Sequence, residues 1–443
     1  MISKYRAQLS ALALVAALSF AAPAHADEAE LRAQIGQLRA QLAQQQQMLE
    51  NMQHQLEEQH ARQEQAPITV APQAAPAEQT VAAAPESDTQ IGGYGEINYN
   101  NYTNDGSRTQ ADLRRFVLSM AHRFNDRLNF NGEIEFEHAI ASADDEGEAE
   151  IEQAWLSYAL NDRVNLKAGL FLMPFGFLNT SHEPSSYYGV ERNEIETRII
   201  PSTWREGGIG VYGDTDFGLG WDVGVTTSFD TAKFEDAGAP LAGVHQELQL
   251  AHAQDLAVYA ALNYHGVPGL TVGASVFRGN SMHDNADFKS DPSLPDFSGV
   301  NAPITLWDAH ARWQAHGFDL QAVYARGSFG DASRIDAIID SYNTANATDL
   351  PFVPRTFSGW LVQGAYTVWN RGEMSLTPFA RYEDFNTQDE MPAGFAADPL
   401  NADHVTTLGL SFNLDPSVVF KTDYQWYGHS ENDRLNVGVG YQF

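Results

Sequence analysis

The feature that most constrains this sequence is an alternation of apolar and polar residues that begins near residue 90 and continues to residue 443. In the last such segment, every second position is apolar or aromatic: Leu435, Val437, Val439, Tyr441 and Phe443. Successive side chains of a β-strand point to opposite faces, so a period of two predicts strands with one apolar face. Counting comparable segments predicts an all-β region of about 16 strands, each roughly ten residues long.

The connections between these segments are of two kinds that alternate along the chain. Short connections lie at 125–126, 161–162, 214–216, 265–268, 314–317, 369–372 and 415–416. Longer connections lie at 103–111, 141–149, 172–206, 230–254, 279–302, 327–355, 386–403 and 428–433. Tight turns at one end and long loops at the other are typical of an up-and-down antiparallel barrel in a bacterial outer membrane. An even number of strands places both ends of such a barrel on the periplasmic side.

A soluble β-sandwich also alternates, and it is the default interpretation of a secreted all-β chain. Three features favour the membrane instead. The segments suit a tilted crossing of about 25 Å of hydrocarbon, and their polar faces carry Gly, Asn, Gln, Asp and Glu, as a water-filled lumen allows. Aromatic residues gather at the predicted strand ends, as at membrane interfaces: Phe124, Tyr158, Trp313, Trp369, Trp426 and Tyr441. Because a closed barrel also leaves no strand edge unpaired in hydrocarbon, we predict a transmembrane β-barrel over residues 90–443.

Residues 1–26 have the three parts of a secretory signal peptide: Lys4 and Arg6, an apolar run from Leu9 to Phe20, and a small-x-small cleavage site at 24–26. The apolar run is shorter than the roughly 20 residues that a helix needs to cross a bilayer. We expect the mature chain to begin near Asp27, outside the cytoplasm. The alternative is that the segment is retained as a membrane anchor.

Residues 27–64 have a helical period. Apolar residues recur there at steps of four and three, with Gln45 in the one polar core position: Leu31, Ile35, Leu38, Leu42, Leu49, Met52 and Leu56. A narrow apolar seam over about four heptads predicts a short α-helical coiled coil between copies of the chain, located in the periplasm. The alternative is an isolated amphipathic helix that contacts the barrel or lipid. Residues 65–89 are rich in Ala, Pro and Gln, which predicts a semi-extended linker.

Composition argues against several classes of function. Lys and Arg total 26 against 58 Asp and Glu, a net charge of −32, and phosphate backbones require a basic surface, so we predict no nucleic-acid binding. Cysteine is absent, which excludes disulfides and thiolate chemistry. The 14 histidines are scattered without ligand spacing in one motif, so we predict no metal and no cofactor. The acidic stretch 144–148 is interpreted as a solvated outer loop, with a cation bridge to lipopolysaccharide as the alternative.

A barrel hydrolase is a remote alternative. Such an enzyme needs a Ser-His-carboxylate group that converges at one level of the wall. His122 and His138 fall on apolar phases of the second and third predicted strands, but no G-x-S-x-G-like element accompanies them. We therefore predict no catalytic residues and no enzymatic activity.

The longest connection, 172–206, is the strongest candidate for a functional element of the lumen. It follows the fifth predicted strand, and its 35 residues exceed what joins neighbouring strands, so we expect it to fold inward. Its charged residues have both signs: Glu183, Glu191, Glu194, Glu196 and Glu206, with Arg192, Arg198 and Arg205. Its apolar residues are expected to pack it against the wall: Phe175, Phe177, Tyr187, Tyr188, Ile199 and Trp204.

The barrel wall supplies further candidates for the lining of the pore. The inward basic candidates are Lys167 and Lys421, with Arg114 or Arg115, and Arg381, as additional members. Against them stand Glu133, Glu135 and Glu137, which alternate with Ile134 and Phe136 and are therefore expected to point into the lumen. A row of carboxylates repels anions locally and attracts cations.

The segment HEPSSYYGVERNEIETRIIPSTWREGG, residues 182–208, resembles a segment of the phosphate-selective porin O/P family of Gram-negative outer membranes. The order of signal peptide, coiled coil, linker and barrel is also similar. Tyr441 and Phe443 on the last strand resemble the recognition signal of outer-membrane barrels. The resemblance implies a homotrimer of diffusion channels, surrounded by lipid and lipopolysaccharide, whose third loop narrows each pore.

The resemblance also bears on selectivity. Phosphate channels of the family carry an inward ladder of arginines and a cluster of lysines, whereas this chain has only five lysines, one of them in the signal peptide. We therefore expect a passive channel for small hydrophilic solutes or ions with weak selectivity. An oxyanion-selective channel for phosphate or dicarboxylates is the main alternative, and a structural tether through the coiled coil is a third function compatible with a pore.

Overall fold

The computed structural model describes residues 88–142 and 145–443. The predicted signal peptide and coiled coil, and all but the last two residues of the predicted linker, lie outside these residues. The described chain forms one antiparallel sheet in which each strand pairs with its neighbours in sequence. Its strands are β1 (Thr89–Tyr102), β2 (Gln110–Arg123), β3 (Leu128–Glu137), β4 (Ala149–Asn161), β5 (Val164–Leu172), β6 (Arg205–Asp214), β7 (Leu219–Thr227), β8 (Leu256–Val267), β9 (Leu270–Gly279), β10 (Ile304–Ala315), β11 (Phe318–Phe329), β12 (Thr356–Tyr366), β13 (Trp369–Arg371), β14 (Met374–Glu390), β15 (Ala402–Asp415), β16 (Val418–Tyr427) and β17 (Arg434–Gln442).

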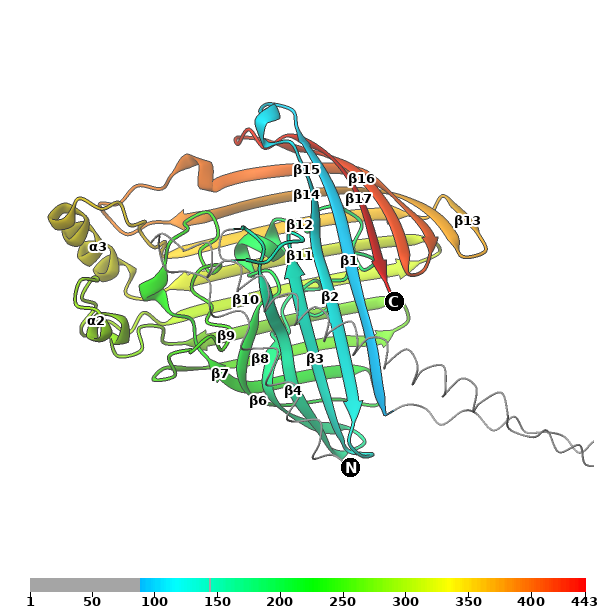
Figure 1. Ribbon diagram of the computed structural model, residues 1–443, viewed down its shortest axis with the longest axis horizontal. Helices are drawn as coiled ribbons and strands as arrows, with labels where there is room; N and C mark the ends of the chain where they lie inside the picture. Colours follow the sequence, from blue (N-terminus) through cyan, green and yellow to red (C-terminus); the bar gives the residue numbers. More distant parts are fainter. Residues whose placement is uncertain (1–87, 143–144) are drawn as a thin grey trace, which may run out of the picture. The chain divides into compact units, whose positions relative to one another are not determined.

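The sheet closes on itself between its first and last strands. β1 pairs with β17 from Tyr94 opposite Gln442 to Tyr102 opposite Arg434, and Gly93 and Phe443 exchange two further backbone hydrogen bonds of 3.0 and 2.9 Å. β12 and the short β13 both pair with β14 and form one crossing, so the barrel has 16 crossings (Figure 1). The predicted closed barrel and its strand number are confirmed.

The period of two in the sequence corresponds to the two faces of the wall. On β17, Leu435 and Val437 are 41% and 46% exposed on the outer face, whereas Asn436 between them is fully buried inside. The barrel therefore presents its aliphatic side chains to hydrocarbon and its polar side chains to the lumen, as the alternation predicts.

Short turns and long loops lie at opposite ends of the barrel. The turn after β2 is held by the Asn125 side chain, which accepts hydrogen bonds from the backbone N–H groups of Arg127 (3.0 Å) and Leu128 (3.1 Å). Helices α2 (Ala286–Ser290) and α3 (Ala332–Asn346) of two long loops lie at the left end in Figure 1, and β13 with its tight turn lies at the right end. The other short helical segments of the described chain are η2 (Gly106–Arg108), η3 (Ile195–Ile199), η4 (Thr231–Lys233) and η5 (Pro399–Asn401). Within the described residues, no helix combines the length and apolar character that a membrane crossing requires.

An aromatic cluster anchors the long loops inside one side of the barrel. The ring of Trp204 lies 5.0 Å from Phe175, 5.1 Å from Phe229 and 5.0 Å from Phe277, and all four side chains are fully buried. Fully burying one such side chain contributes about 1.5–3 kcal/mol. The cluster joins the connection between β5 and β6 to the β7–β8 connection and to β9.

Candidate functional site

The connection between β5 and β6, residues 173–204, crosses the lumen; we call it the third loop. On the side of the barrel remote from β5 and β6, the backbone N–H of Val190 donates to Asp423 Oδ2 of β16 (2.7 Å). Lys421 Nζ of β16 donates to the carbonyl of Gly189 (3.0 Å), and Ser411 Oγ of β15 donates to the carbonyl of Tyr188 (2.9 Å). These bonds hold the loop against the opposite wall, so the expected inward folding is confirmed.

A buried carboxylate closes the third loop on itself. Glu196 accepts hydrogen bonds from Leu178 N–H (2.8 Å), Phe177 N–H (2.5 Å) and Asn193 Nδ2 (2.6 Å). Gly176 has a φ of +57°, and a Cβ there would lie 2.2 Å from Glu196 Oε1, so this close approach requires glycine. Burial raises the pKa of Glu196, and the hydrogen bonds from Leu178 and Asn193 oppose the rise. Glu196 therefore shapes the loop and does not face open lumen.

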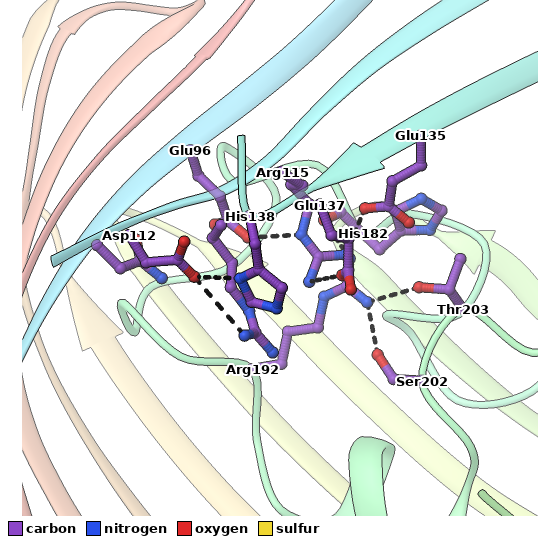
Figure 2. Close-up of polar contacts among 12 residues, drawn as sticks. Glu96, Asp112, Arg115, Glu135, Glu137, His138, His182, Arg192, Ser202 and Thr203 are labelled. Atoms are coloured by element: carbon purple, nitrogen blue, oxygen red, sulfur yellow. Dashed lines mark hydrogen bonds and ion pairs between the residues drawn. The ribbon is translucent and has the colours of Figure 1, made fainter. Parts of the chain in front are cut away.

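The three arginines of this region also hold the loop in place. Arg192 is buried and donates from Nη1 to Ser202 Oγ (2.6 Å) and Thr203 Oγ1 (2.8 Å) (Figure 2). Arg205, at the start of β6, pairs with Glu150 and, at 2.9 Å, with Glu247. Arg198 pairs with Glu194 and is the most exposed of the three, since a third of its side chain is accessible.

The acidic residues of the third loop differ in their surroundings. Glu194 accepts a hydrogen bond from the hydroxyl of Tyr427 (2.5 Å) on β16, and its own N–H donates to Glu383 (2.7 Å) on β14. Glu191 accepts from Asn100 Nδ2 (2.9 Å) on β1. Glu183 is half-buried and borders a cavity in the lumen. Of the sequence-predicted acids in this loop, Glu183 is the one whose carboxylate has no hydrogen bond or ion pair to another described residue.

The two predicted lysines point inward, and each has fixed partners. Lys167 on β5 is buried, with Nζ 2.5 Å from Asp222 of β7 and 4.2 Å from the centre of the Phe171 ring. Lys421 on β16 is also buried, with Nζ 3.6 Å from the centre of the Tyr187 ring. Both ammonium groups are therefore held by fixed partners in the wall or the loop.

The predicted acidic row of β3 faces inward, but an arginine on the neighbouring strand compensates it. Arg115 of β2 lies 2.8 Å from Glu96, 3.1 Å from Glu135 and 3.7 Å from Glu137 (Figure 2). Glu133, at the other end of the row, accepts from Gln153 Nε2 (2.6 Å). The row is therefore half of an ion-pair network, and the sequence-based interpretation of it as a bare negative field is incomplete.

Several carboxylates that belong to these ion-pair networks were not identified from the sequence. Glu96 alternates with Ile97 on β1, and Glu150 and Glu152 alternate with Ile151 on β4, so the periodicity that identified the β3 row also indicates that these carboxylates face inward. Asp222, Glu383 and Asp423 face inward as well and pair with the third loop or with wall cations.

Two polar cavities lie between the third loop and the wall, toward the end with short turns. One has a volume of about 590 Å³ and is lined by Gln90, Ser119, Glu133, His182, Glu183 and Gln442, among others. The other, of about 290 Å³, is bordered by Tyr188, Arg312, Asp319 and Ser411. The lumen therefore contains space with hydrogen-bonding walls for water and small solutes beside a loop that narrows it.

The two histidines that suggested a hydrolase lie at opposite ends of the barrel. His122, near the end of β2, contacts Thr89 Oγ1 at 2.7 Å. His138 lies beyond β3, with a φ of +55°, and contacts Asp112 Oδ2 at 2.8 Å near the start of β2. The prediction that His138 occupies the apolar face of the third strand is wrong because β3 ends at Glu137. One hydrolytic group cannot contain both histidines.

A closed barrel with an apolar outer face, a polar lumen and an inward third loop defines a porin of the outer membrane, a channel rather than an enzyme. The chain belongs to the family described as "Phosphate-selective porin O and P", whose model matches residues 90–391. An uncharacterized protein of Aquifex aeolicus (strain VF5) is 31% identical over 361 residues, which cover 80% of this chain and 79% of that protein. The family expected from residues 182–208 is therefore confirmed.

Solved structures agree on the fold. The OmpF porin of Salmonella typhi, in a complex with daunomycin, matches with a TM-score of 0.52 and 13% identity over 80% of this chain and 97% of that one. The outer membrane channel DcaP of Acinetobacter baumannii matches with a TM-score of 0.50 and 13% identity over the same shares. At this identity the likeness concerns the fold alone.

Proposed function

We propose that this porin is a weakly selective passive channel in which opposite charges are paired with each other along the wall of the lumen instead of being arranged as a ladder of one sign. The observation that carries the proposal is Arg115, which is buried among Glu96, Glu135 and Glu137. A lumen concentrates ions of one sign when unpaired charges of the other sign line it. Paired charges produce a local transverse field and only a small net potential along the axis.

Three other inward cations support the same proposal. Lys167 pairs with Asp222 at 2.5 Å, Arg312 with Asp319 at 2.6 Å, and Arg381 with Glu383 at 2.7 Å. Each guanidinium or ammonium group already has the carboxylate that a passing anion would have to displace. Small hydrophilic solutes are the substrates that such a lumen accommodates without strong binding.

An oxyanion-selective channel is the second candidate, and Arg192 is the observation that favours it. Arg192 is a buried cation without a carboxylate partner within ion-pair distance among residues 88–142 and 145–443, although Ser202 and Thr203 occupy part of its donor set. A guanidinium group binds oxyanions through pairs of parallel hydrogen bonds. In this second candidate, phosphate or a dicarboxylate would occupy a site beside Arg192.

The remaining organisation is proposed from the sequence and the family. Residues 1–26 would direct export, residues 27–64 would form a periplasmic coiled coil, and residues 65–89 would link the coiled coil to the barrel. The assembled form would be a homotrimer surrounded by lipid and lipopolysaccharide. Tyr441 and Phe443, at the end of the last strand, would act as the assembly signal.

Planar-bilayer recording under a salt gradient tests the two candidates directly. A weakly selective channel should give a reversal potential close to zero and an unchanged conductance when phosphate or succinate is added. A reversal potential near that of a perfectly anion-selective membrane, together with block by phosphate that disappears in Arg192→Gln, would contradict the weakly selective channel and support the oxyanion channel.

A further inference from the structure

A β-bulge in β4 places an additional carboxylate at the contact between the wall and the third loop. Glu133 pairs with Gln153 but the next residue, Ile134, pairs with Ile151, so Glu152 is the extra residue of the bulge. Bulges re-aim side chains and are frequent beside functional sites. Here the Glu152 side chain is fully buried, and its Oε2 lies 3.8 Å from His182 Nε2 of the third loop.

Two buried side chains at this contact lack an ordinary hydrogen-bond donor or acceptor. Glu152 receives no hydrogen bond from an amide, amine or hydroxyl group of any described residue, and its one hydrogen-bond neighbour there is the carboxyl group of Glu135. Nε2 of His182, which is 4% exposed, has no hydrogen bond to any described residue. A buried charged group without hydrogen bonds costs several kcal/mol, so native structures rarely retain one without a compensating ligand. Glu133 and Glu152 also have no lysine or arginine within ion-pair distance in the part of the chain that the structure describes.

His182 is oriented as a ligand. Its Nδ1 lies 3.2 Å from the backbone carbonyl of Asn179, which can only accept, so Nδ1 carries the proton and the neutral ring has its lone pair on Nε2, 3.8 Å from Glu152 Oε2. Metal-binding histidines almost always donate their other ring N–H to a carbonyl or carboxylate in this way. Glu133 is oriented similarly by the hydrogen bond from Gln153 Nε2.

The three side chains converge closely enough to share one ion. One ligand atom from each of Glu133, Glu152 and His182 lies within 4.8 Å of the other two. Ligand atoms around a tetrahedral zinc at about 2.0–2.1 Å are about 3.4 Å apart, so side-chain shifts of about 1 Å complete the geometry. An imidazole nitrogen with two carboxylates suits a borderline divalent metal better than the hard ions Mg²⁺ and Ca²⁺.

The site is reachable, and its local charge is suitable. Glu133 and His182 line the 590 Å³ cavity at the end with short turns, which leads a hydrated cation to the ligands. Oxygen atoms of Glu135 and Glu150 also lie within 4.8 Å of Glu152. Of the nearby guanidinium groups, Arg115 pairs with Glu96 and Glu135, and Arg205 pairs with Glu150. Arg192, which donates to the His182 carbonyl (3.3 Å), has no carboxylate within ion-pair distance among the described residues, and the three carboxylates Glu133, Glu150 and Glu152 offset its charge.

We propose that Glu133, Glu152 and His182 bind one divalent transition-metal ion, with Zn²⁺ as the best match, and that the ion ties the third loop to the barrel wall. The fourth coordination position faces the cavity and is filled by water. The bound ion adds positive charge beside the narrowed lumen, and it therefore increases the preference of the channel for anions. This inference is independent of whether the unliganded channel is weakly or strongly selective.

Zinc titration of the full-length protein in detergent tests the site. The protein is stripped with EDTA and titrated at neutral pH by calorimetry, together with Glu152→Gln, His182→Asn and the control His429→Asn, which belongs to a separate His/Asp group with Asp403 and His404. We expect one tight site per chain in the wild type and the control, weakened more than about 10-fold in both site variants. Equal Zn²⁺ affinity in the wild type and the two site variants would overturn the proposal.

Two further measurements keep the test decisive if Glu152→Gln does not fold. His182→Asn changes only the loop, so this variant and the wild type are sufficient for the comparison. Zinc should raise the thermal stability of the wild type and shift its reversal potential toward anion preference, with neither effect in His182→Asn. Absence of tight Zn²⁺ binding to the metal-free wild type would instead indicate that Glu135 and Glu152 share a proton, and it would refute the metal site.

Discussion

Replacing Arg115 with glutamine is the sharpest perturbation of the charge network in the lumen. Arg115 is buried, and its guanidinium group lies within 3.7 Å of three carboxylates on the two neighbouring strands. After the substitution, Glu96 keeps the hydrogen bond from the Tyr187 hydroxyl (2.8 Å). Glu135 keeps no cationic partner among the described residues, so it becomes a buried charge without compensation.

The expected loss of folding stability follows because the substitution removes the cation but leaves the Glu135 carboxylate buried. Removing one partner of a buried ion pair typically destabilises a protein by about 3–5 kcal/mol, because the other charge stays buried. With a denaturant dependence of about 3 kcal/mol per molar urea, the unfolding midpoint should fall by about 1 M or more. The loss of one positive charge from the lumen should also shift the reversal potential toward cations.

The assay is urea unfolding of the protein in detergent, followed by tryptophan fluorescence, together with a bilayer recording. Arg123→Gln is the matched control, since Arg123 lies on the same strand but is about half exposed and pairs with the exposed Asp88, and such surface pairs contribute at most about 1 kcal/mol. The double variant Arg115→Gln/Glu135→Gln should recover part of the lost stability. If Arg115→Gln and Arg123→Gln have the same midpoint and the same reversal potential, the paired-charge description of the lumen is wrong.

Three further predictions test other parts of the molecule. Trp204→Ala should destabilise the barrel by about 3–5 kcal/mol, measured by urea unfolding, because it empties the centre of the aromatic cluster; an unchanged midpoint would refute that packing. Burial raises the pKa of Asp336 in α3 to about 7, although the bond from Val353 N–H opposes the rise. The folded loop therefore binds this proton more tightly than the unfolded loop does, and its stability declines as pH rises from about 4 to about 7. Hydrogen exchange of α3 should quicken over that range beyond its intrinsic pH dependence, and Asp336→Asn should abolish the excess. Deleting residues 31–56 should weaken the trimer and leave each barrel folded; native mass spectrometry that finds equally stable trimers would contradict the coiled-coil prediction.

The sequence by itself determined the barrel, because the relevant signal is local. A period of two assigns each residue of a strand to the lipid or to the lumen without knowledge of any other strand. Asn436 between Leu435 and Val437 is one example, and the inward row of Glu133, Glu135 and Glu137 is another. Turn residues such as Asn125 mark the strand ends for the same local reason.

The partner of each inward charge was decided by the tertiary structure alone. Arg115 meets Glu96 and Glu135 because of the registers of β2 with β1 and β3, and these registers depend on pairing between whole strands. The bulge at Glu152 changes the inward face of β4 in the middle of the strand, so strict alternation does not reveal that Glu152 and Gln153 both face the interior. The third loop brings His182 to β4 and Gly189 to β16 across the lumen. Contacts across the lumen join residues that are far apart in the sequence, and the periodicity of the sequence carries no information about them. The physical reason is that alternation determines which face of the wall a side chain occupies, whereas strand register and the path of the loop determine its neighbours.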